Sequence, residues 1–290
     1  MKRNTVSPPS RIKLTDSAIL EGDALNALRI LPPRFAQCVV TSPPYWGLRD
    51  YHIDGQIGLE PTLPQFINHL VAVFNEVKRV LRDDGILWLN IGDGYTSGNR
   101  RYRAADKKNP ARAMTTRPDT PDGLKPKDLQ GIPWRLAFAL QEDGWYLRSD
   151  IVWNKPNAMP ESVKDRPTRS HEYLFMLTKS KQYYYDYDAI RETGLDGRYR
   201  NRRSVWDVNT QAFSDSHFAT FPAKLIEPCI AASTRKDDYV LDPFFGSGTV
   251  GVVCTHKHRR YVGIELNPDY VLLAAKRLNA AKEEIIKVAV

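Results

Sequence analysis

Short apolar segments alternate with helical patterns along the chain, and this alternation constrains the fold more than any other feature. Apolar runs bounded by turn residues predict buried strands at 37–41, 85–91, 150–153, 173–178, 239–241 and 260–265. Apolar residues spaced three and four apart predict helices at 63–81, 132–141, 222–232, 249–256 and 268–281. We therefore expect an α/β fold in which helices cover both faces of a mostly parallel sheet, with functional loops at the carboxyl ends of the strands.

Two basic segments interrupt this alternation. Residues 95–128 show almost no apolar periodicity and hold nine basic against four acidic residues, a net +5 out of +8 for the 290-residue chain. The second segment, 186–216, carries an arginine cluster: Arg198, Arg200, Arg202 and Arg203. Irregular segments longer than about 12 to 15 residues in a compact domain are functional or disordered. We expect both to be long loops on one domain, with a polyanion as a plausible partner.

Composition excludes several classes of protein. A hydrophobic fraction of 42% with 10% aromatic residues indicates a folded chain rather than a disordered basic tail. Cys38, Cys229 and Cys254 stand far apart without metal-ligand spacing, so we expect neither a disulfide framework nor a metal site. No apolar run approaches the roughly 18 to 20 residues of a membrane span, and the first 20 residues lack the apolar centre of a signal peptide. A cytoplasmic protein is expected.

The loop after the first core strand has the composition of a binding site for a planar base. Val39-Val40-Thr41 is followed by Ser42, Pro43, Pro44, Tyr45 and Trp46. The two prolines stiffen the backbone and remove two donors, so local carbonyls can face a ligand as acceptors. The Ser42 hydroxyl and the Pro43 carbonyl would accept from an exocyclic amino group while an aromatic ring stacks on the base. The alternative is a proline turn whose aromatic residues close the core.

A second loop, near the carboxyl end, predicts a site for a nucleoside-containing cofactor. Tyr239 to Thr249 spans a strand, a turn with Gly246 and Gly248, and the start of a helix. These glycines let the backbone approach a ligand closely. Glu265, at the end of the following strand, is placed to accept from both ribose hydroxyls. The loop alone leaves open whether the cofactor is a nicotinamide dinucleotide or S-adenosylmethionine.

Taken together, the two motifs resemble the amino-methylating DNA methyltransferases. Ser-Pro-Pro-Tyr at 42–45 precedes Asp-Pro-Phe-x-Gly-Ser-Gly-Thr at 242–249, the circularly permuted order of the beta class of that family. The resemblance runs from about residue 18 to 280 and includes Glu21-Gly22-Asp23-Ala24, Trp153-Asn154-Lys155-Pro156 and the segment 217–222. It implies a Rossmann-like methyltransferase fold with a seven-stranded sheet in one catalytic domain, 1–290. Residues 95–128 would then be a basic insertion and 186–216 a target-recognition segment.

The resemblance also assigns roles to individual residues. Ser42, Pro43, Pro44 and Tyr45 would hold the target base. The S-adenosylmethionine site would comprise Asp23, Ala24, Thr41, Thr220, Phe221, Pro222, Lys224, Asp242, Phe244, Gly246, Ser247, Gly248, Thr249 and Glu265, and the product would be S-adenosylhomocysteine. DNA contacts are expected from Trp46, Arg100, Arg101, Arg103, Arg112, Arg198, Arg200, Arg202 and Arg203. Trp46 has a core position as its alternative.

Two target bases are open. Many adenine-directed relatives carry Asp where this chain has Ser42, and Ser there is the usual mark of cytosine N4 methylation. The longer string 41–51, with Trp206-Asp207-Val208 and residues 217–222, resembles relatives associated with adenine, so adenine N6 is narrowly favoured over cytosine N4. Less favoured readings are an RNA or protein amide methyltransferase, a non-catalytic DNA-binding protein and a nicotinamide oxidoreductase. Carbon-5 cytosine methylation needs a cysteine nucleophile. Cys229 lies in an apolar helical pattern, so we expect it to be a core residue instead.

The resemblance implies partners as well. The substrate would be double-stranded DNA whose target base is flipped out of the helix, because a stacked base cannot reach such a pocket. A homodimer is expected in a bacterial or phage cytoplasm, and a companion restriction endonuclease is left open. No membrane partner is expected.

Overall fold

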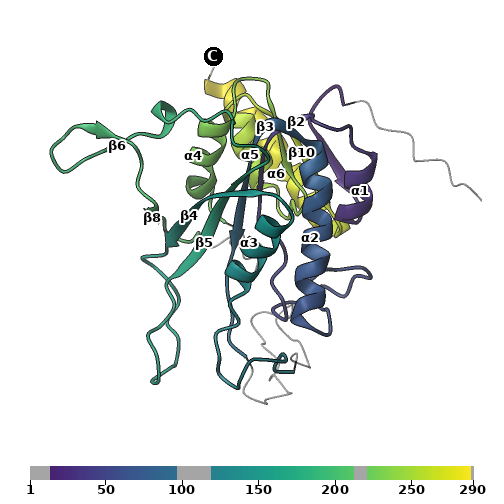
Figure 1. The fold of residues 1–290 in the computed structure, drawn as a ribbon. Coiled ribbons are helices and arrows are strands. Elements are labelled where there is room, and N and C mark those ends of the chain that lie inside the picture. The colour runs from purple at the N-terminus through teal and green to yellow at the C-terminus, as the bar shows by residue number, and fades with distance from the viewer. Residues whose placement is uncertain (1–13, 97–118, 212–220, 289–290) are drawn as a thin grey trace, which may run out of the picture.

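The computed structural model describes residues 14–96, 119–211 and 221–288, and it forms one large sheet (Figure 1). Eight strands lie in the order β1-β10-β9-β2-β3-β5-β4-β8. Their bounds are Ala18–Glu21 (β1), Arg260–Glu265 (β10), Tyr239–Asp242 (β9), Ala36–Thr41 (β2), Leu81–Ile91 (β3), His171–Thr178 (β5), Tyr146–Asn154 (β4) and Val205–Asp207 (β8). Only β5 is antiparallel to its neighbours, so the predicted mostly parallel sheet is confirmed.

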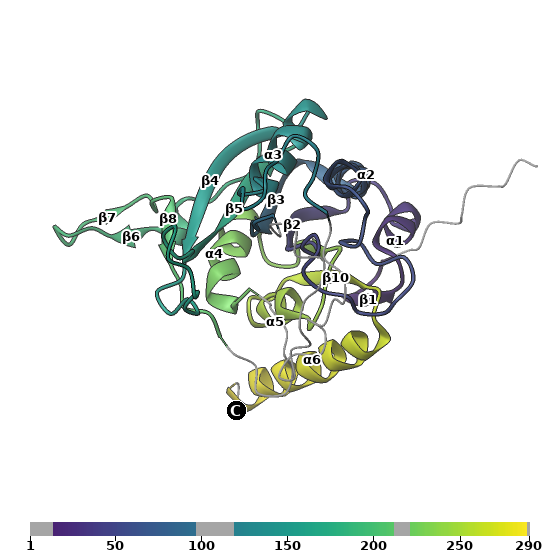
Figure 2. The same cartoon turned by 90° about the horizontal axis from the view of Figure 1, so that it is seen from below.

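Helices cover both faces of this sheet, as expected for an α/β fold (Figure 2). The first three helices pack on one face: α1 (Ala24–Ile30), α2 (Leu63–Val80) and α3 (Ile132–Glu142). The last three pack on the other: α4 (Ala223–Ser233), α5 (Thr249–His256) and α6 (Pro268–Val288). None of the helices in the described ranges is long and apolar enough to cross a membrane.

Local sequence explains the central elements. Every residue of β2 is buried, which suits a central parallel strand covered on both faces. The α2 helix begins after Thr62, whose hydroxyl accepts from the Gln65 backbone N–H, and its apolar stripe includes the fully buried Phe66, Leu70 and Phe74. All five predicted helices and all six predicted strands are present, with bounds close to the expected ones.

Several short elements were not predicted. The α1 helix has only seven residues and depends on Asp23, whose carboxylate accepts from the Asn26 backbone N–H at 2.9 Å. The edge strand β8 makes the described sheet eight-stranded where seven strands were expected. A two-stranded hairpin of β6 (Glu192–Thr193) and β7 (Tyr199–Arg200) precedes β8, after a single 3-10 turn, η2 (Asp188–Ile190). Segments this short carry too few residues to show periodicity.

The direction of winding reverses between β2 and β9, and this point positions the site. From β2 the chain proceeds to β3 through α2, whereas from β9 it proceeds to β10 through α5 on the opposite face. Open α/β sheets bind ligands outside the carboxyl ends of the strands at such a switch point. The loop 155–170 follows the carboxyl end of β4, so it lies on the same side of the sheet as the loops at the switch point. The hairpin, which joins β5 to β8, leaves at the opposite edge and stands away from the body (Figure 1).

Candidate active site

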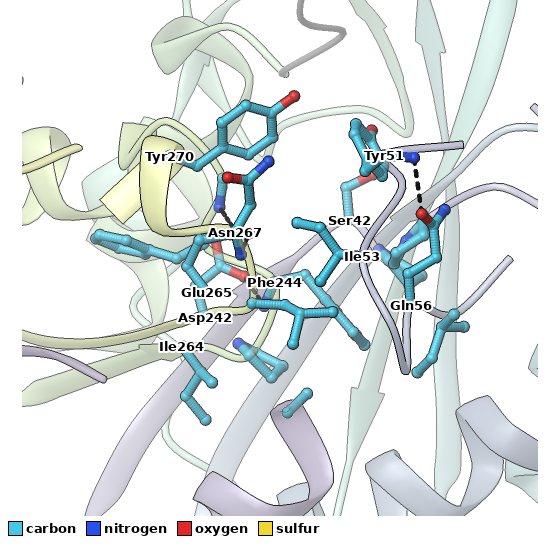
Figure 3. A pocket seen from close by; sticks show the side chains of 18 of the residues that line it. Ser42, Tyr51, Ile53, Gln56, Asp242, Phe244, Ile264, Glu265, Asn267 and Tyr270 are labelled. Atoms are coloured by element: carbon cyan, nitrogen blue, oxygen red, sulfur yellow. Dashed lines mark hydrogen bonds between the residues drawn. The ribbon is translucent and has the colours of Figure 1, made fainter. Parts of the chain in front are cut away.

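A cavity lies at the switch point, between the loop after β2 and the loops after β9 and β10 (Figure 3). Figure 3 shows Tyr51, Ile53 and Gln56 on one wall, facing Glu265, Asn267 and Tyr270 on the other. The structure thus brings together the two motifs that the sequence separates by roughly 200 positions. The predicted site residues that line the cavity are Asp23, Ala24, Ser42, Pro43, Pro44, Tyr45, Phe221, Asp242, Phe244, Gly246, Ser247, Thr249 and Glu265.

The glycine loop and Glu265 form one hydrogen-bonded unit. Gly246 adopts a φ of 52°, and its backbone N–H donates to Glu265 Oε2 at 2.7 Å. The other carboxylate oxygen accepts from the Asn267 backbone N–H at 2.8 Å. Burial raises the pKa of Glu265, and the backbone hydrogen bonds offset only part of that effect. The carboxylate is held in a fixed orientation, with remaining lone pairs available to a ligand that carries hydroxyl groups.

Asp242 connects the two halves of the site from beneath the cavity. Its Oδ1 accepts from the Thr41 hydroxyl at 2.7 Å and from the Phe244 backbone N–H at 3.0 Å. Complete burial raises the pKa of Asp242 to about 7, with the Thr41 hydrogen bond acting in the opposite direction. The side chain of Thr41 is fully buried and is not among the cavity lining, so its described contact positions Asp242.

Tyr45, in the loop after β2, is held by a contact to β5. The Tyr45 hydroxyl donates to Glu172 Oε2 on β5 at 2.7 Å. Ser42, Pro43 and Pro44 line the cavity beside it. Acceptors and a fixed aromatic ring therefore face the same space, the arrangement that a planar base with an exocyclic amino group requires.

Sequence reasoning missed one wall of the cavity. Residues 48–57 fold over it, and their internal bonds run from the Tyr51 backbone N–H to Gln56 Oε1 at 2.7 Å and from Gln56 Nε2 to the Arg49 carbonyl at 2.9 Å. The Tyr51 ring meets the Tyr270 ring edge to face, with centroids 5.8 Å apart. The available signal was a stretch of some twenty residues without apolar periodicity between the first strand and the next helix.

Other predicted cofactor residues lie elsewhere. Gly248, at a φ of 80°, begins α5, where an added Cβ would come within 2.9 Å of the Ala274 Cβ. Pro222 precedes α4, and Lys224 lines a separate polar hollow with Arg202 and Glu227. Thr220 lies outside the described residues. Gly248 therefore allows the close packing of α5 against α6, and the cofactor roles of Gly248, Pro222 and Lys224 stay predictions.

The expected DNA contacts divide into three groups. The prediction that Trp46 contacts DNA is wrong. Only 5% of the residue is exposed, and its Nε1 donates to the Glu60 carbonyl at 2.9 Å, so the ring belongs to the core. Arg100, Arg101, Arg103 and Arg112 lie outside the described residues, as does most of the 95–128 insertion.

The third group is the arginine cluster of the hairpin and its neighbours. Arg200 pairs with Glu192 at 2.9 Å, and Arg203 lies 3.9 Å from the same carboxylate. The Arg202 guanidinium stacks 4.3 Å from the Trp206 ring centroid. Arg198 is exposed on the hairpin. The structure places the cluster at the outer edge of the sheet, away from the cavity.

No cysteine nucleophile or metal cluster appears in the described ranges. Cys229 is fully buried, and burial raises its pKa well above the usual value, so its thiol is a core group. No group of three or more His, Cys, Asp or Glu side chains in these ranges could hold a metal ion.

Comparisons with known proteins agree with this geometry. A DNA methylase family model, for N6 and N4 methyltransferases, matches residues 36–276. The chain is 70% identical over 278 residues to the type II methyltransferase M.Cfr9I of Citrobacter freundii, covering 96% of this chain and 93% of the relative. It is 68% identical over 296 residues to M.XycI of Xanthomonas campestris pv. cyanopsidis, covering 99% of both.

Solved structures share the fold. The cytosine-N4-specific PvuII DNA methyltransferase matches with a TM-score of 0.69 and 20% identity, covering 97% of this chain and 95% of that one. A DNA modification methylase of Thermus thermophilus, described as putative and complexed with S-adenosyl-L-methionine, matches with a TM-score of 0.65 and 24% identity, covering 91% and 94%. With both motifs in one cavity and a family model spanning the fold, this chain belongs to the N6 and N4 amino-methyltransferase family of DNA methylases.

Proposed function

We propose that the chain transfers a methyl group from S-adenosylmethionine to the exocyclic amino group of a base flipped out of double-stranded DNA. One observation carries the proposal: the Ser42 loop and the Gly246 loop with Glu265 line the same cavity. A methyl donor and an amine acceptor must meet within near-contact distance, and a shared cavity provides that proximity.

The residues present fit the cofactor. The partly buried Glu265 carboxylate, held by two backbone N–H groups, is suited to accept from a ribose diol. An added Cβ at Gly246 would meet nothing within 4 Å, so open space borders the glycine backbone where the methionine part would lie. Asp23 and Ala24 line the same cavity for the adenine. When bound, the cofactor supplies a methyl group already activated by a cationic sulfonium.

The chain's own residues would act mainly by positioning. The Ser42 hydroxyl and the Pro43 carbonyl accept hydrogen bonds from the amino group and stabilise positive charge as it develops on the nitrogen. Flipping the base costs roughly a few kcal/mol, and stacking of the Tyr45 ring on the base offsets part of that cost. No covalent intermediate with the protein is needed.

We place cytosine N4 first as the target atom. Ser42 occupies the position where many adenine-directed relatives carry Asp, and the PvuII enzyme that shares the fold is described as cytosine-N4-specific. Adenine N6, which the longer strings around 41–51 and 206–208 favour, is the second candidate. Both reactions use the same two acceptors, so the two candidates differ in the base that the pocket admits.

The relatives' description as type II methyltransferases supports a role in restriction and modification. A companion endonuclease with the same recognition sequence belongs to this proposal. The homodimer expected from the resemblance stays a prediction.

Nucleoside analysis of DNA from cells expressing the chain tests the proposal and identifies the base. N4-methylcytosine is the expected product, N6-methyladenine would establish the second candidate, and absence of both would contradict DNA amino-methylation. Ser42→Ala should abolish the product while calorimetry shows unchanged S-adenosylmethionine binding. Ser180→Ala, at a serine outside both the cavity and the 186–216 segment, is the matched control. Methylation by Ser42→Ala at the parental rate would refute the assignment of Ser42.

A further inference from the structure

A partly buried polar network lies behind the loop that follows β2 and carries Ser42 and Tyr45, here called the target-base loop. Glu172 on β5 is its centre: Oε2 accepts from the Tyr45 hydroxyl at 2.7 Å and from Asn90 Nδ2 at 3.2 Å. Oε1 accepts from the Lys155 ammonium at 2.5 Å. The Glu172 and Lys155 side chains are only 16% and 18% exposed. Each carboxylate oxygen has a donor, so the ion pair is hydrogen-bonded on both sides, as a buried charge must be.

The surroundings leave the Tyr45 ring little freedom. A Cβ added at Gly92 would lie 2.8 Å from Tyr45 Cε2 and 3.2 Å from Glu172 Cδ, so the backbone of β3's end presses against both side chains. Lys155 is itself fixed, with its ammonium 4.3 Å from the Trp153 ring centroid. The ring of Tyr45 is therefore held by packing at one edge and by its hydroxyl at the tip.

The network joins four separate elements. Tyr45 belongs to the loop after β2, Asn90 to β3, Glu172 to β5 and Lys155 to the end of β4. Its members other than Tyr45 do not line the cavity, so they would act on a bound base only through the tyrosine. A hydrogen bond to an ionised acceptor is about twice as strong as one between neutral groups, which suits a contact that must hold an aromatic plane in place.

We propose that Glu172, with Lys155 as its counterion, is a positioning residue that holds the Tyr45 ring in the plane on which the flipped base stacks. This inference rests on the proposed function. Burial and the neighbouring Glu172 charge raise the pKa of the Tyr45 hydroxyl well above its usual value, which keeps the hydroxyl protonated as the donor. The carboxylate therefore directs the tyrosine proton away from the base and leaves the ring face for stacking.

A double-mutant cycle on Tyr45→Phe and Glu172→Gln tests the proposal. Each single variant should lower kcat by about 10- to 100-fold, the equivalent of losing a hydrogen bond to a charged group. The double variant should be no slower than the slower single variant by more than about threefold, because both changes act on the same charged hydrogen bond. Tyr45→Phe removes its donor, and Glu172→Gln removes the charge of its acceptor. Lys155→Met should lower kcat in the same range, since it leaves the Glu172 charge without its counterion.

Two readouts and one control variant separate positioning from a structural role. The dissociation constant for S-adenosylmethionine should stay within about twofold of the parental value in every variant. The fluorescence of an analogue of the methylated base at the target position, pyrrolocytosine for cytosine or 2-aminopurine for adenine, should report less complete or more mobile stacking in Tyr45→Phe and Glu172→Gln. The control is Glu76→Gln, which breaks an ion pair to Arg79 of similar burial on α2 and should leave kcat unchanged.

Two outcomes would overturn the inference. One is a double variant whose loss in kcat equals the product of the two single losses. The other is an unchanged kcat in either single variant. Tyr45→Phe removes the hydrogen bond without changing any charge, but the Tyr45 hydroxyl also contacts Ser42. Lys155→Met leaves both hydroxyls in place and acts through Glu172, so it decides the question if Glu172→Gln fails to fold. A parental chain that methylates no DNA would instead refute the proposed function, so the two failures are distinguishable.

Discussion

The Thr41 hydroxyl donates a 2.7 Å hydrogen bond to the carboxylate of Asp242, across 201 positions of sequence. The two residues end the neighbouring strands β2 and β9, from which the target-base loop and the cofactor loop depart. This buried contact adds to the pairing of β2 with β9 in holding one loop in place relative to the other. Under the proposed function the two loops hold the two reacting groups, so a misplacement of about 1 Å between them would slow methyl transfer.

Asp242→Asn should make stability less dependent on pH. Burial raises the pKa of Asp242 from 3.8 to about 7, so the folded chain binds this proton more tightly than the unfolded chain. Stability from this group is greatest below the unfolded pKa and falls as the pH rises toward 7, by at most about 1.4 kcal/mol per pH unit.

Urea unfolding of the cofactor-free protein between pH 5 and 7.5 measures this effect. Relative to Asp242→Asn, the parental chain should lose stability as the pH rises. Thr41→Val, which removes the donor but keeps the shape, should destabilise the fold by about 1 kcal/mol or more. Parallel stability curves for the parental chain and Asp242→Asn would show that Asp242 is ionised throughout the range.

Glu265→Gln should weaken cofactor binding by about 10- to 100-fold, because ribose hydroxyls lose a charged acceptor. The amide nitrogen would also face the backbone N–H of Gly246 or Asn267, two donors that now meet carboxylate oxygens. Since burial raises the pKa of Glu265, affinity in the parental chain should fall as acidic solution protonates the carboxylate. Calorimetry with S-adenosylmethionine measures both effects, with Ser42→Ala as the control expected to bind normally.

Lys164→Ala should weaken DNA binding more than Arg198→Ala does. Lys164 is exposed in the loop that leaves β4 at the cavity edge of the sheet, whereas the Arg198 hairpin leaves at the opposite edge. DNA whose base enters the cavity must lie over the side of the sheet where the cavity opens, which is the side of the Lys164 loop.

Fluorescence anisotropy across a range of salt concentrations compares the two variants. A lost phosphate contact lowers the slope of log affinity against log salt by about 1. Lys236→Ala, exposed before β9, is the matched control and should behave as the parental chain. A larger loss in Arg198→Ala would assign the hairpin to the DNA interface, as the sequence suggested.

Trp46→Phe should destabilise the fold without weakening DNA binding. The substitution leaves the Glu60 carbonyl without its buried donor, which costs about 1 to 3 kcal/mol, and it also removes buried ring volume. Chemical unfolding measures the stability, and anisotropy at a temperature where the variant is fully folded measures the affinity. A drop in affinity with unchanged stability would return Trp46 to the DNA interface.

Features of the fold and of the site could be predicted where the sequence signal for them lies within a few neighbouring residues. Strand and helix positions, such as β10 at 260–265 and α5 at 249–256, follow from the spacing of apolar residues within a dozen positions. The Pro-Pro-Tyr and Gly-Ser-Gly motifs are equally local, because stiff carbonyls and close backbone approach depend on residue type alone. The wall formed by Tyr51 and Tyr270 has no such signature, since it exists only once the loop folds against α6.

The sequence by itself thus determined the α/β class, the two half-sites and the family. Only the tertiary structure decided which candidates face the cavity: Trp46 turns into the core, and Thr41 bonds to Asp242 beneath the site. It alone revealed that Glu172 holds Tyr45 across 127 positions. The physical reason is that propensity and periodicity act over a few residues, whereas burial, ion pairing and hydrogen-bond partners depend on which strands become neighbours in the sheet.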